Sequence, residues 1–288
     1  MELSKLLLEH LYKIGNAPSR DLEEAQKIDT SNDSFNKFLG CVFADKKRDN
    51  ISFNFLKLIQ SYDSCLDYLI NTNFSLSRFG DGEFRVISGE SHDFNDINIK
   101  LKNKLIQTLR NPHEKCALGL VSTLFRSRLP NEYWERVSRK CKPIIIENIN
   151  FDRVYLNANM TLVFAKQSNH WDRYFAKFRS IWNRENIILV ANFDQLDTYK
   201  YNIFDNAAKI IKINAPARNA FAEYDELIQQ ISLHDRSNII ILILGMTATV
   251  MANDLSIMGY RALDVGHLAK CYSFYKEGKS KTADFFLT

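Results

Sequence analysis

The sequence has few cysteines and little net charge, and each shortage argues against a class of protein. Its five cysteines include no C-x-x-C pair and their number is odd, which argues against a disulfide framework or a structural zinc site and predicts reduced thiols. The formal net charge is only +4, and the lysines and arginines are spread along the chain. We therefore expect no nucleic-acid partner.

Long apolar runs are also missing. The longest run, residues 239–244, has the length of a strand, far short of the roughly 20 apolar residues that span a bilayer. The first residues have helical apolar spacing, but Glu9, His10 and Lys13 interrupt it, so we expect no signal peptide there. We expect a cytoplasmic protein. Its amphipathic N-terminal helix either packs against the folded domain or contacts the inner face of the plasma membrane.

The chain has no internal repeat and divides by pattern near residue 72. Residues 1–72 have helical spacing and predict an N-terminal helical extension. From residue 73 to 288, strand-like apolar runs alternate with helical patterns, which predicts an α/β domain with a mostly parallel sheet and flanking helices. Segment 142–165 stays open between strand and buried helix. The predicted strands are 75–79, 117–121, 187–191, 209–213, 239–244 and 261–265, and the predicted helices lie at about 96–110, 130–140, 169–182, 219–231 and 247–258.

A pair of acidic residues follows the first predicted strand, in Arg78-Phe79-Gly80-Asp81-Gly82-Glu83. Residues two apart in an extended backbone point the same way, so we predict that Asp81 and Glu83 converge on one Mg²⁺ or Mn²⁺ ion that also binds phosphate. Arg78 is expected to contact that phosphate, with Phe79 and Gly80 completing the substrate-binding segment. The alternative is a tight turn with solvated acids.

A second candidate anion site follows the apolar run 239–244. Gly245 makes a turn and a predicted helix begins after it, which places free backbone N–H groups and the positive helix end at the carboxyl edge of the sheet. Thr247 and Thr249 add hydroxyl groups that could bind a nucleotide phosphate. Capping of the helix by Thr247 alone is the alternative interpretation.

Two further polar residues, Asp264 and His267, follow the last predicted strand. Ligands of parallel α/β sheets bind outside the carboxyl ends of the strands, so both are expected beside the same site. A carboxylate or an imidazole there could act as a general base. A structural or surface role for His267 is the alternative.

These motifs together resemble the GT-D glycosyltransferases, a bacterial family long known only as a domain of unknown function. The hexapeptide 78–83 resembles the family's D-x-E signature, and the resemblance covers about residues 74–275. The other similar segments, in order, are Ile203-Phe204-Asp205-Asn206-Ala207, Ala215-Pro216-Ala217-Arg218-Asn219-Ala220-Phe221, Leu244-Gly245-Met246-Thr247-Ala248-Thr249-Val250, Asp254-Leu255, Gly259-Tyr260 and Asp264-Val265-Gly266-His267.

The resemblance implies a Rossmann-like domain, a nucleoside-diphosphate sugar donor and Mn²⁺ or Mg²⁺ held by Asp81 and Glu83, in bacterial surface polysaccharide or glycoprotein glycan synthesis. It also places Asn219 near the donor. The chain departs from the family pattern at two points, because Thr161-Leu162 replaces Ser-Arg or Thr-Arg and Ala191-Asn192 replaces Glu-Gly. Either the substrate differs or another basic residue, Lys166 or Arg173, substitutes for the missing arginine.

The predicted function is hexosyl transfer from a UDP-sugar to a glycan or lipid-linked glycan acceptor. Two alternatives stay open: a metal-dependent phosphohydrolase that uses the same acids, and a non-catalytic nucleotide-binding subunit of a glycan-assembly complex. A dinucleotide-dependent enzyme is disfavoured because no G-x-G-x-x-G follows a predicted strand. The donor sugar, the stereochemical outcome and self-association into homo-oligomers are not determined by the sequence.

Overall fold

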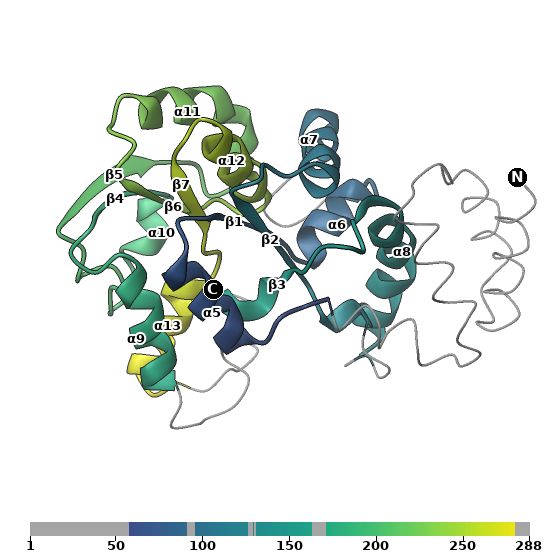
Figure 1. Ribbon diagram of the computed structural model, residues 1–288, viewed down its shortest axis with the longest axis horizontal. Helices are drawn as coiled ribbons and strands as arrows, with labels where there is room; N and C mark the ends of the chain where they lie inside the picture. Colours follow the sequence, from purple (N-terminus) through teal and green to yellow (C-terminus); the bar gives the residue numbers. More distant parts are fainter. Residues whose placement is uncertain (1–57, 91–95, 126–128, 130, 163–170, 280–288) are drawn as a thin grey trace, which may run out of the picture. The chain divides into compact units, whose positions relative to one another are not determined.

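The computed structural model describes residues 58–90, 96–125, 129, 131–162 and 171–279 (Figure 1). The chain divides into two compact units. The larger unit, Ile59–Val121 with Tyr155–Thr288, holds the sheet, and the smaller unit includes Ser122–Val154.

A seven-stranded, all-parallel sheet forms the centre of the larger unit, in the order β3-β2-β1-β7-β6-β4-β5. This confirms the predicted α/β class and its parallel sheet. Each of the six predicted strands is present to within a residue or two. The seventh, β3, has only two residues, too short for a hydrophobic pattern. The strands are β1 (Ser75–Phe79), β2 (Cys116–Leu120), β3 (Leu156–Asn157), β4 (Asn186–Ala191), β5 (Lys209–Asn214), β6 (Ile239–Ile243) and β7 (Arg261–Asp264).

Helices cover both faces of this sheet, so strands β4 and β6 are apolar at nearly every position. One face packs against α5, α9 and α13 in a core that includes Leu66, Phe178, Trp182 and Cys271. On the other side of the sheet, α12 packs against β1 and β7, α11 packs against β5 and α12, and α7 packs against α12. Figure 1 shows α11 and α12 on the opposite side of the sheet from α9 and α13. The helices are α5 (Tyr62–Asn71), α6 (Asp81–Ile87), α7 (Ile99–Arg110), α9 (Trp171–Ile181), α10 (Phe193–Leu196), α11 (Tyr224–Ser232), α12 (Met246–Ile257) and α13 (Leu268–Lys276), with 3₁₀ turns η2 (Ala158–Thr161) and η3 (Ala220–Glu223).

The N-terminal extension predicted for residues 1–72 lies mostly outside the described residues. Within its described part, α5 packs Cys65, Leu66 and Leu69 into the core of the sheet unit. The boundary near residue 72 stays a prediction. Among the described residues, no helix is long and apolar enough to cross a bilayer.

Segment 142–165, for which the sequence did not decide between strand and buried helix, is partly helical. Its first residues extend α8 (Glu132–Asn148) of the smaller unit, which continues past Pro143. Asn131 begins this helix, because its side-chain oxygen accepts from the N–H of Trp134 at 3.2 Å. The unit also contains the 3₁₀ turn η1 (Thr123–Phe125), whose Leu124 carbonyl accepts from Ser138 Oγ at 2.9 Å.

Candidate active site

Three helices begin at the carboxyl ends of three neighbouring strands. Helix α6 follows β1, α13 follows β7 and α12 follows β6, and these strands are adjacent in the order β1-β7-β6. A helix N-terminus carries a positive partial charge and N–H groups without intrahelical partners. The parallel crossovers therefore gather three anion-attracting helix ends along one short stretch of the sheet edge.

The paired acids lie in a helix, so their predicted extended backbone is wrong. Gly80 has extended φ/ψ as the N-cap of α6, and Asp81, Gly82 and Glu83 form the first turn. Residues two apart in a helix point about 200° apart, so the two carboxylates do not converge through their backbone. The helix begins here because the Glu83 carboxylate accepts from the Gly80 N–H at 2.7 Å, while Phe84 packs into the core.

Glu83 turns its carboxylate inward, toward β7 and α12. Its Oε2 binds Gly80 N–H, and its Oε1 lies 3.4 Å from Thr249 Oγ1. Burial and, to a lesser extent, the charge of Asp264 raise the pKa of Glu83, while the charge of Arg78 and the backbone hydrogen bonds lower it, and together these effects place the pKa at about 7. Glu83 therefore gains and loses a proton near neutral pH in the protein without bound ligands.

Arg78 and Asp264 form an ion pair beside Glu83. Arg78 Nη2 donates to Asp264 Oδ1 at 2.8 Å, and Arg78 Nε donates to the Asp264 carbonyl at 2.9 Å. The side chain of Asp264 is only 2% exposed and that of Arg78 17% exposed. Burial raises the pKa of Asp264 in spite of the Arg78 charge. The predicted general base thus faces Arg78 and protein interior, and the predicted phosphate contact, Arg78, is bonded to Asp264.

Thr249 lies between the two carboxylates. Its hydroxyl donates to the Arg78 carbonyl at 2.9 Å, and Oγ1 also lies 3.4 Å from both Glu83 Oε1 and Asp264 Oδ2. The residue is completely buried on α12. Because the hydroxyl has only one proton, it donates that proton to the Arg78 carbonyl of β1 while its oxygen lies beside both acids.

The start of α12 has the features expected of an anion site. Gly245 is its N-cap, with φ +54° and ψ −138°, and no side chain caps the helix. Thr247 is fully buried, and its Oγ1 has no hydrogen-bond partner in the described part of the chain. The alternative of capping by Thr247 is therefore wrong, and the helix end carries an unused hydroxyl.

Asn219 binds another part of the protein with both ends of its amide. Its Oδ1 accepts from the Asp96 N–H at 2.8 Å, and its Nδ2 donates to Asp96 Oδ2 at 2.7 Å. Asp96 precedes α7, so Asn219 joins the loop after β5 to the loop before α7. No local pattern indicates this partner, which lies 123 residues away.

Replacing Asn219 tests both its backbone and its amide. Its φ of +56° is left-handed, a conformation that costs an alanine roughly 1–2 kcal/mol. We expect Asn219→Ala to lower the free energy of unfolding by about that amount, and Asn219→Gly to lower it less because glycine accepts this φ. Urea denaturation measures both values. Equal losses would mean that the amide bonds, rather than the backbone, account for the effect.

The remaining predicted residues divide between core and surface. Phe79 is fully buried and its ring centroid lies 5.8 Å from that of Phe84, so it belongs to the core. His267 is exposed at the carboxyl edge, as the residue before α13. Asn192 caps α10 by accepting from Gln195 N–H at 3.0 Å. Lys166 lies outside the described residues, and Arg173 is exposed on α9.

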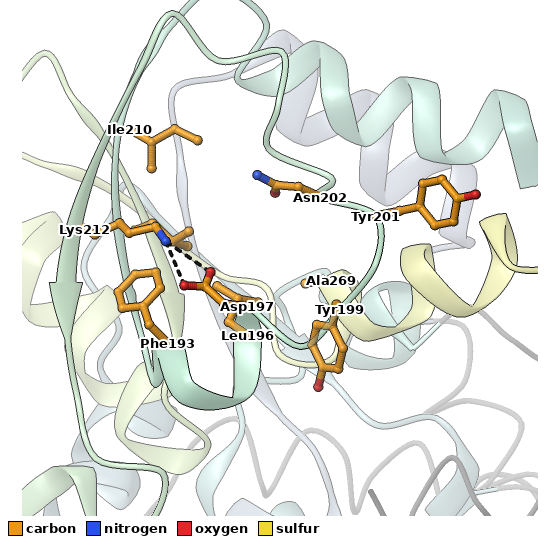
Figure 2. A pocket seen from close by; sticks show the side chains of 10 residues that line it. Phe193, Leu196, Asp197, Tyr199, Tyr201, Asn202, Ile210, Lys212 and Ala269 are labelled. Carbon is orange, nitrogen blue, oxygen red and sulfur yellow. Dashed lines mark hydrogen bonds and ion pairs between the residues drawn. The ribbon is translucent and has the colours of Figure 1, made fainter.

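A small cavity of about 120 Å³ lies elsewhere, against β4, β5, α10 and α13. Figure 2 shows Lys212 and Asp197 facing each other beside the ring of Phe193. Lys212 Nζ binds both Asp197 oxygens, at 3.0 and 3.1 Å, and lies 4.5 Å from the centroid of Phe193. The charges of this cavity are already paired, and neither Glu83 nor Asp264 lines it.

Comparison with known proteins shows which family this chain belongs to. A family model described as the glycosyltransferase GT-D fold matches residues 76–285. The probable glycosyl transferase Gly of Streptococcus gordonii is 27% identical over 241 residues, covering 77% of this chain and 33% of the relative. Glycosyltransferase GlyD of Streptococcus pneumoniae serotype 4 is 27% identical over 240 residues, covering 79% and 29%. The chain thus spans about a third of the length of these curated relatives.

Solved structures agree with this match. A conserved domain of unknown function, described as having a distinct glycosyltransferase fold, superposes with a TM-score of 0.72 at 25% identity, covering 82% of this chain and 91% of that one. A structure described as a new glycosyltransferase from Streptococcus sanguinis has a TM-score of 0.65 at 26% identity, covering 77% and 86%.

Proposed function

Because this chain belongs to the family of glycosyltransferases with the GT-D fold, we propose that it transfers a hexose from a UDP-sugar to a glycan acceptor. The observation that carries the donor assignment is the meeting of α6, α12 and α13 at the ends of three adjacent strands. These helix ends attract a diphosphate. The unused Thr247 hydroxyl at the start of α12 is a further group suited to a phosphate oxygen.

The same edge offers acidic ligands for a divalent cation. No group of three or more His, Cys, Asp and Glu side chains that could hold a metal occurs within the described residues. Mg²⁺ needs only one or two protein carboxylates when it also takes phosphate oxygens and water. Although Asp81 and Glu83 do not converge through their backbone, the Glu83 carboxylate reaches back to Gly80, the residue before Asp81, so a cation at the start of α6 can take one or both acids as that limited donor set. A cation there would offset the negative charge that Glu83 and Asp264 share beside Arg78. We propose that Asp81 and Glu83 hold Mn²⁺ or Mg²⁺, which when bound stabilises the leaving diphosphate.

The side chains at the edge differ in what they can do for the acceptor. Transfer forms a bond between the acceptor oxygen and the anomeric carbon, breaks the bond to the diphosphate, and releases the acceptor's hydroxyl proton. His267 is exposed at this edge and would take that proton. Asp264 is buried against Arg78 and would not reach an acceptor. A glycan or lipid-linked glycan of a bacterial surface polymer or glycoprotein, made at the inner face of the plasma membrane, is the acceptor that we propose.

The donor assignment is tested by calorimetry with UDP, with and without Mn²⁺. We expect Mn²⁺ to tighten UDP binding to the wild type, and the Asp81→Ala, Glu83→Ala double variant to lose that gain. A matched control is Glu226→Ala, which removes an exposed carboxylate from α11. Unchanged UDP binding in the double variant would remove these acids from the donor site.

Turnover measurements then separate the alternatives. A transferase releases UDP from a UDP-hexose faster when an acceptor is present. A phosphohydrolase would turn over the sugar nucleotide equally fast without any acceptor. A nucleotide-binding subunit would bind UDP tightly and transfer nothing to any acceptor in a panel.

A further inference from the structure

Arg78 reaches past the neighbouring strand β2 to the 3₁₀ turn η2, which follows β3. Besides its two bonds to Asp264 of β7, its Nη1 donates to the Ala158 carbonyl of η2 at 3.1 Å. Strand β2 separates β1 from β3 and η2, and the residue paired with Arg78 on β2 is Gly119. A side chain at Gly119 would begin 3.5 Å from Arg78 Cγ and 3.3 Å from the Ala158 backbone. The missing side chain therefore allows Arg78 to cross β2.

A second glycine lies against the guanidinium of Arg78. A Cβ atom at Gly266 would lie 2.8 Å from Arg78 Cζ, closer than real Cβ contacts allow. Gly266 also donates its N–H to Asp264 Oδ1 at 3.1 Å, and its φ of +46° suits glycine. Two glycines, Gly119 beside Arg78 Cγ and Gly266 beside the guanidinium, thus leave the space that the Arg78 side chain occupies.

The ion pair is connected to Glu83 through Thr249. The Thr249 hydroxyl binds the Arg78 carbonyl and lies 3.4 Å from both Asp264 Oδ2 and Glu83 Oε1. Moving Arg78 or Asp264 would therefore change the space that the Glu83 carboxylate occupies. The Arg78 guanidinium donates to one carboxylate oxygen and two carbonyl oxygens, so three of its five N–H groups already bind the protein. These bonds fix the guanidinium within the protein.

From these contacts we propose that Arg78, Asp264 and Thr249 are positioning residues, which hold the Glu83 carboxylate in place without themselves touching the donor. This assignment rests on the proposed function, in which Glu83 acts at the diphosphate. It replaces the roles that the sequence predicted for Arg78 as a phosphate ligand and for Asp264 as a base.

Calorimetry with UDP separates a positioning residue from a phosphate ligand. For Arg78→Met we expect the Kd for UDP in EDTA to stay within about threefold of the wild type, because no phosphate contact is lost. The gain in UDP affinity on adding Mn²⁺ should fall about tenfold, by analogy with other residues that orient metal ligands. A loss of tenfold or more in both conditions would identify a direct phosphate contact and overturn the proposal, as would an unchanged Mn²⁺ gain.

Thr249 provides a second pair of variants, in case Arg78→Met does not fold. Thr249→Val keeps the shape of the side chain and removes the hydroxyl, whereas Thr249→Ser keeps the hydroxyl. We expect Thr249→Val to lose most of the Mn²⁺ gain in UDP affinity and Thr249→Ser to recover a large part of it. Equal losses in the two variants would show that packing, rather than the hydroxyl, is responsible, and would contradict the proposal.

A double-mutant cycle tests the same contacts without any ligand. Thr249→Val and Glu83→Gln are made singly and together, and the unfolding equilibrium constant is measured at pH 8. We expect the two changes to be coupled by at least about threefold, because residues in one hydrogen-bonding network are not additive. Additive effects would overturn the positioning role. Absence of any UDP binding by the wild type, with coupling present, would count against the proposed function alone.

Discussion

Replacing Glu83 with glutamine is expected to stabilise the protein above neutral pH while weakening its donor site. Glu83 titrates with a pKa of about 7 in the folded protein, against an ordinary value of 4.5. The folded state therefore holds this proton more tightly than the unfolded state does, and the wild type loses stability as pH rises from about 4.5 to 7. A glutamine at this position has no proton to lose, so the variant escapes this loss.

Glutamine also suits the contacts of Glu83. Its amide oxygen can accept from the Gly80 N–H, and its NH₂ group can donate to Thr249 Oγ1. We expect the stability of Glu83→Gln relative to the wild type to rise by on the order of 1–3 kcal/mol between pH 5 and pH 8. The lower end of this range allows for solvent screening, because the Glu83 side chain is partly exposed. The Mn²⁺-dependent gain in UDP affinity should fall by roughly 10- to 100-fold.

Urea denaturation in EDTA at both pH values measures the stability difference, and calorimetry measures UDP binding. Glu226→Gln, on the exposed surface of α11, shows what the same chemical change does away from the site. A stability difference that does not change with pH would show that Glu83 is not held in a desolvated, negatively charged setting. Full Mn²⁺-dependent binding in the variant would remove Glu83 from the donor site.

Replacing Gly245 with alanine is expected to damage both the fold and the donor site. Its φ of +54° with ψ of −138° lies in a region that only glycine occupies readily. Forcing alanine into such a conformation costs about 1–3 kcal/mol. Helix α12 is almost entirely buried between β1, β7 and α7, so it cannot shift without disturbing the core. We expect a loss near the upper end of that range, and weaker UDP binding because the first turn of α12 moves.

The free energy of unfolding and the Kd for UDP in EDTA test this prediction together. Gly89→Ala is the matched control, since Gly89 also has a positive φ, of +85°, but a Cβ atom there would meet nothing within 4 Å. We expect a loss of about 1 kcal/mol in the control, at the lower end of what a left-handed backbone costs an alanine, and unchanged UDP binding. If Gly245→Ala binds UDP as tightly as the wild type, the start of α12 does not contact the nucleotide.

The fold could be predicted from the sequence where local patterns are strong. Residues 187–190 and 239–244 are continuous runs of branched apolar side chains, which is the pattern of strands buried on both faces. The two-residue strand β3 and the helix α6 were not predicted. A strand of two residues has no periodicity, and the glycines on either side of Asp81 favoured a loop over a helix.

Local sequence is enough to establish which residues reach the carboxyl edge, because in a parallel sheet the residues after each strand must lie there. That rule alone brings Asp81, Gly245 and His267 to one edge. The contacts of their neighbours depend instead on the packing of distant segments. Arg78 meets Asp264 because β1 pairs with β7, at a separation of 186 residues, and it crosses β2 because Gly119 leaves space. Strand order arises from such long-range contacts, and no local pattern encodes them.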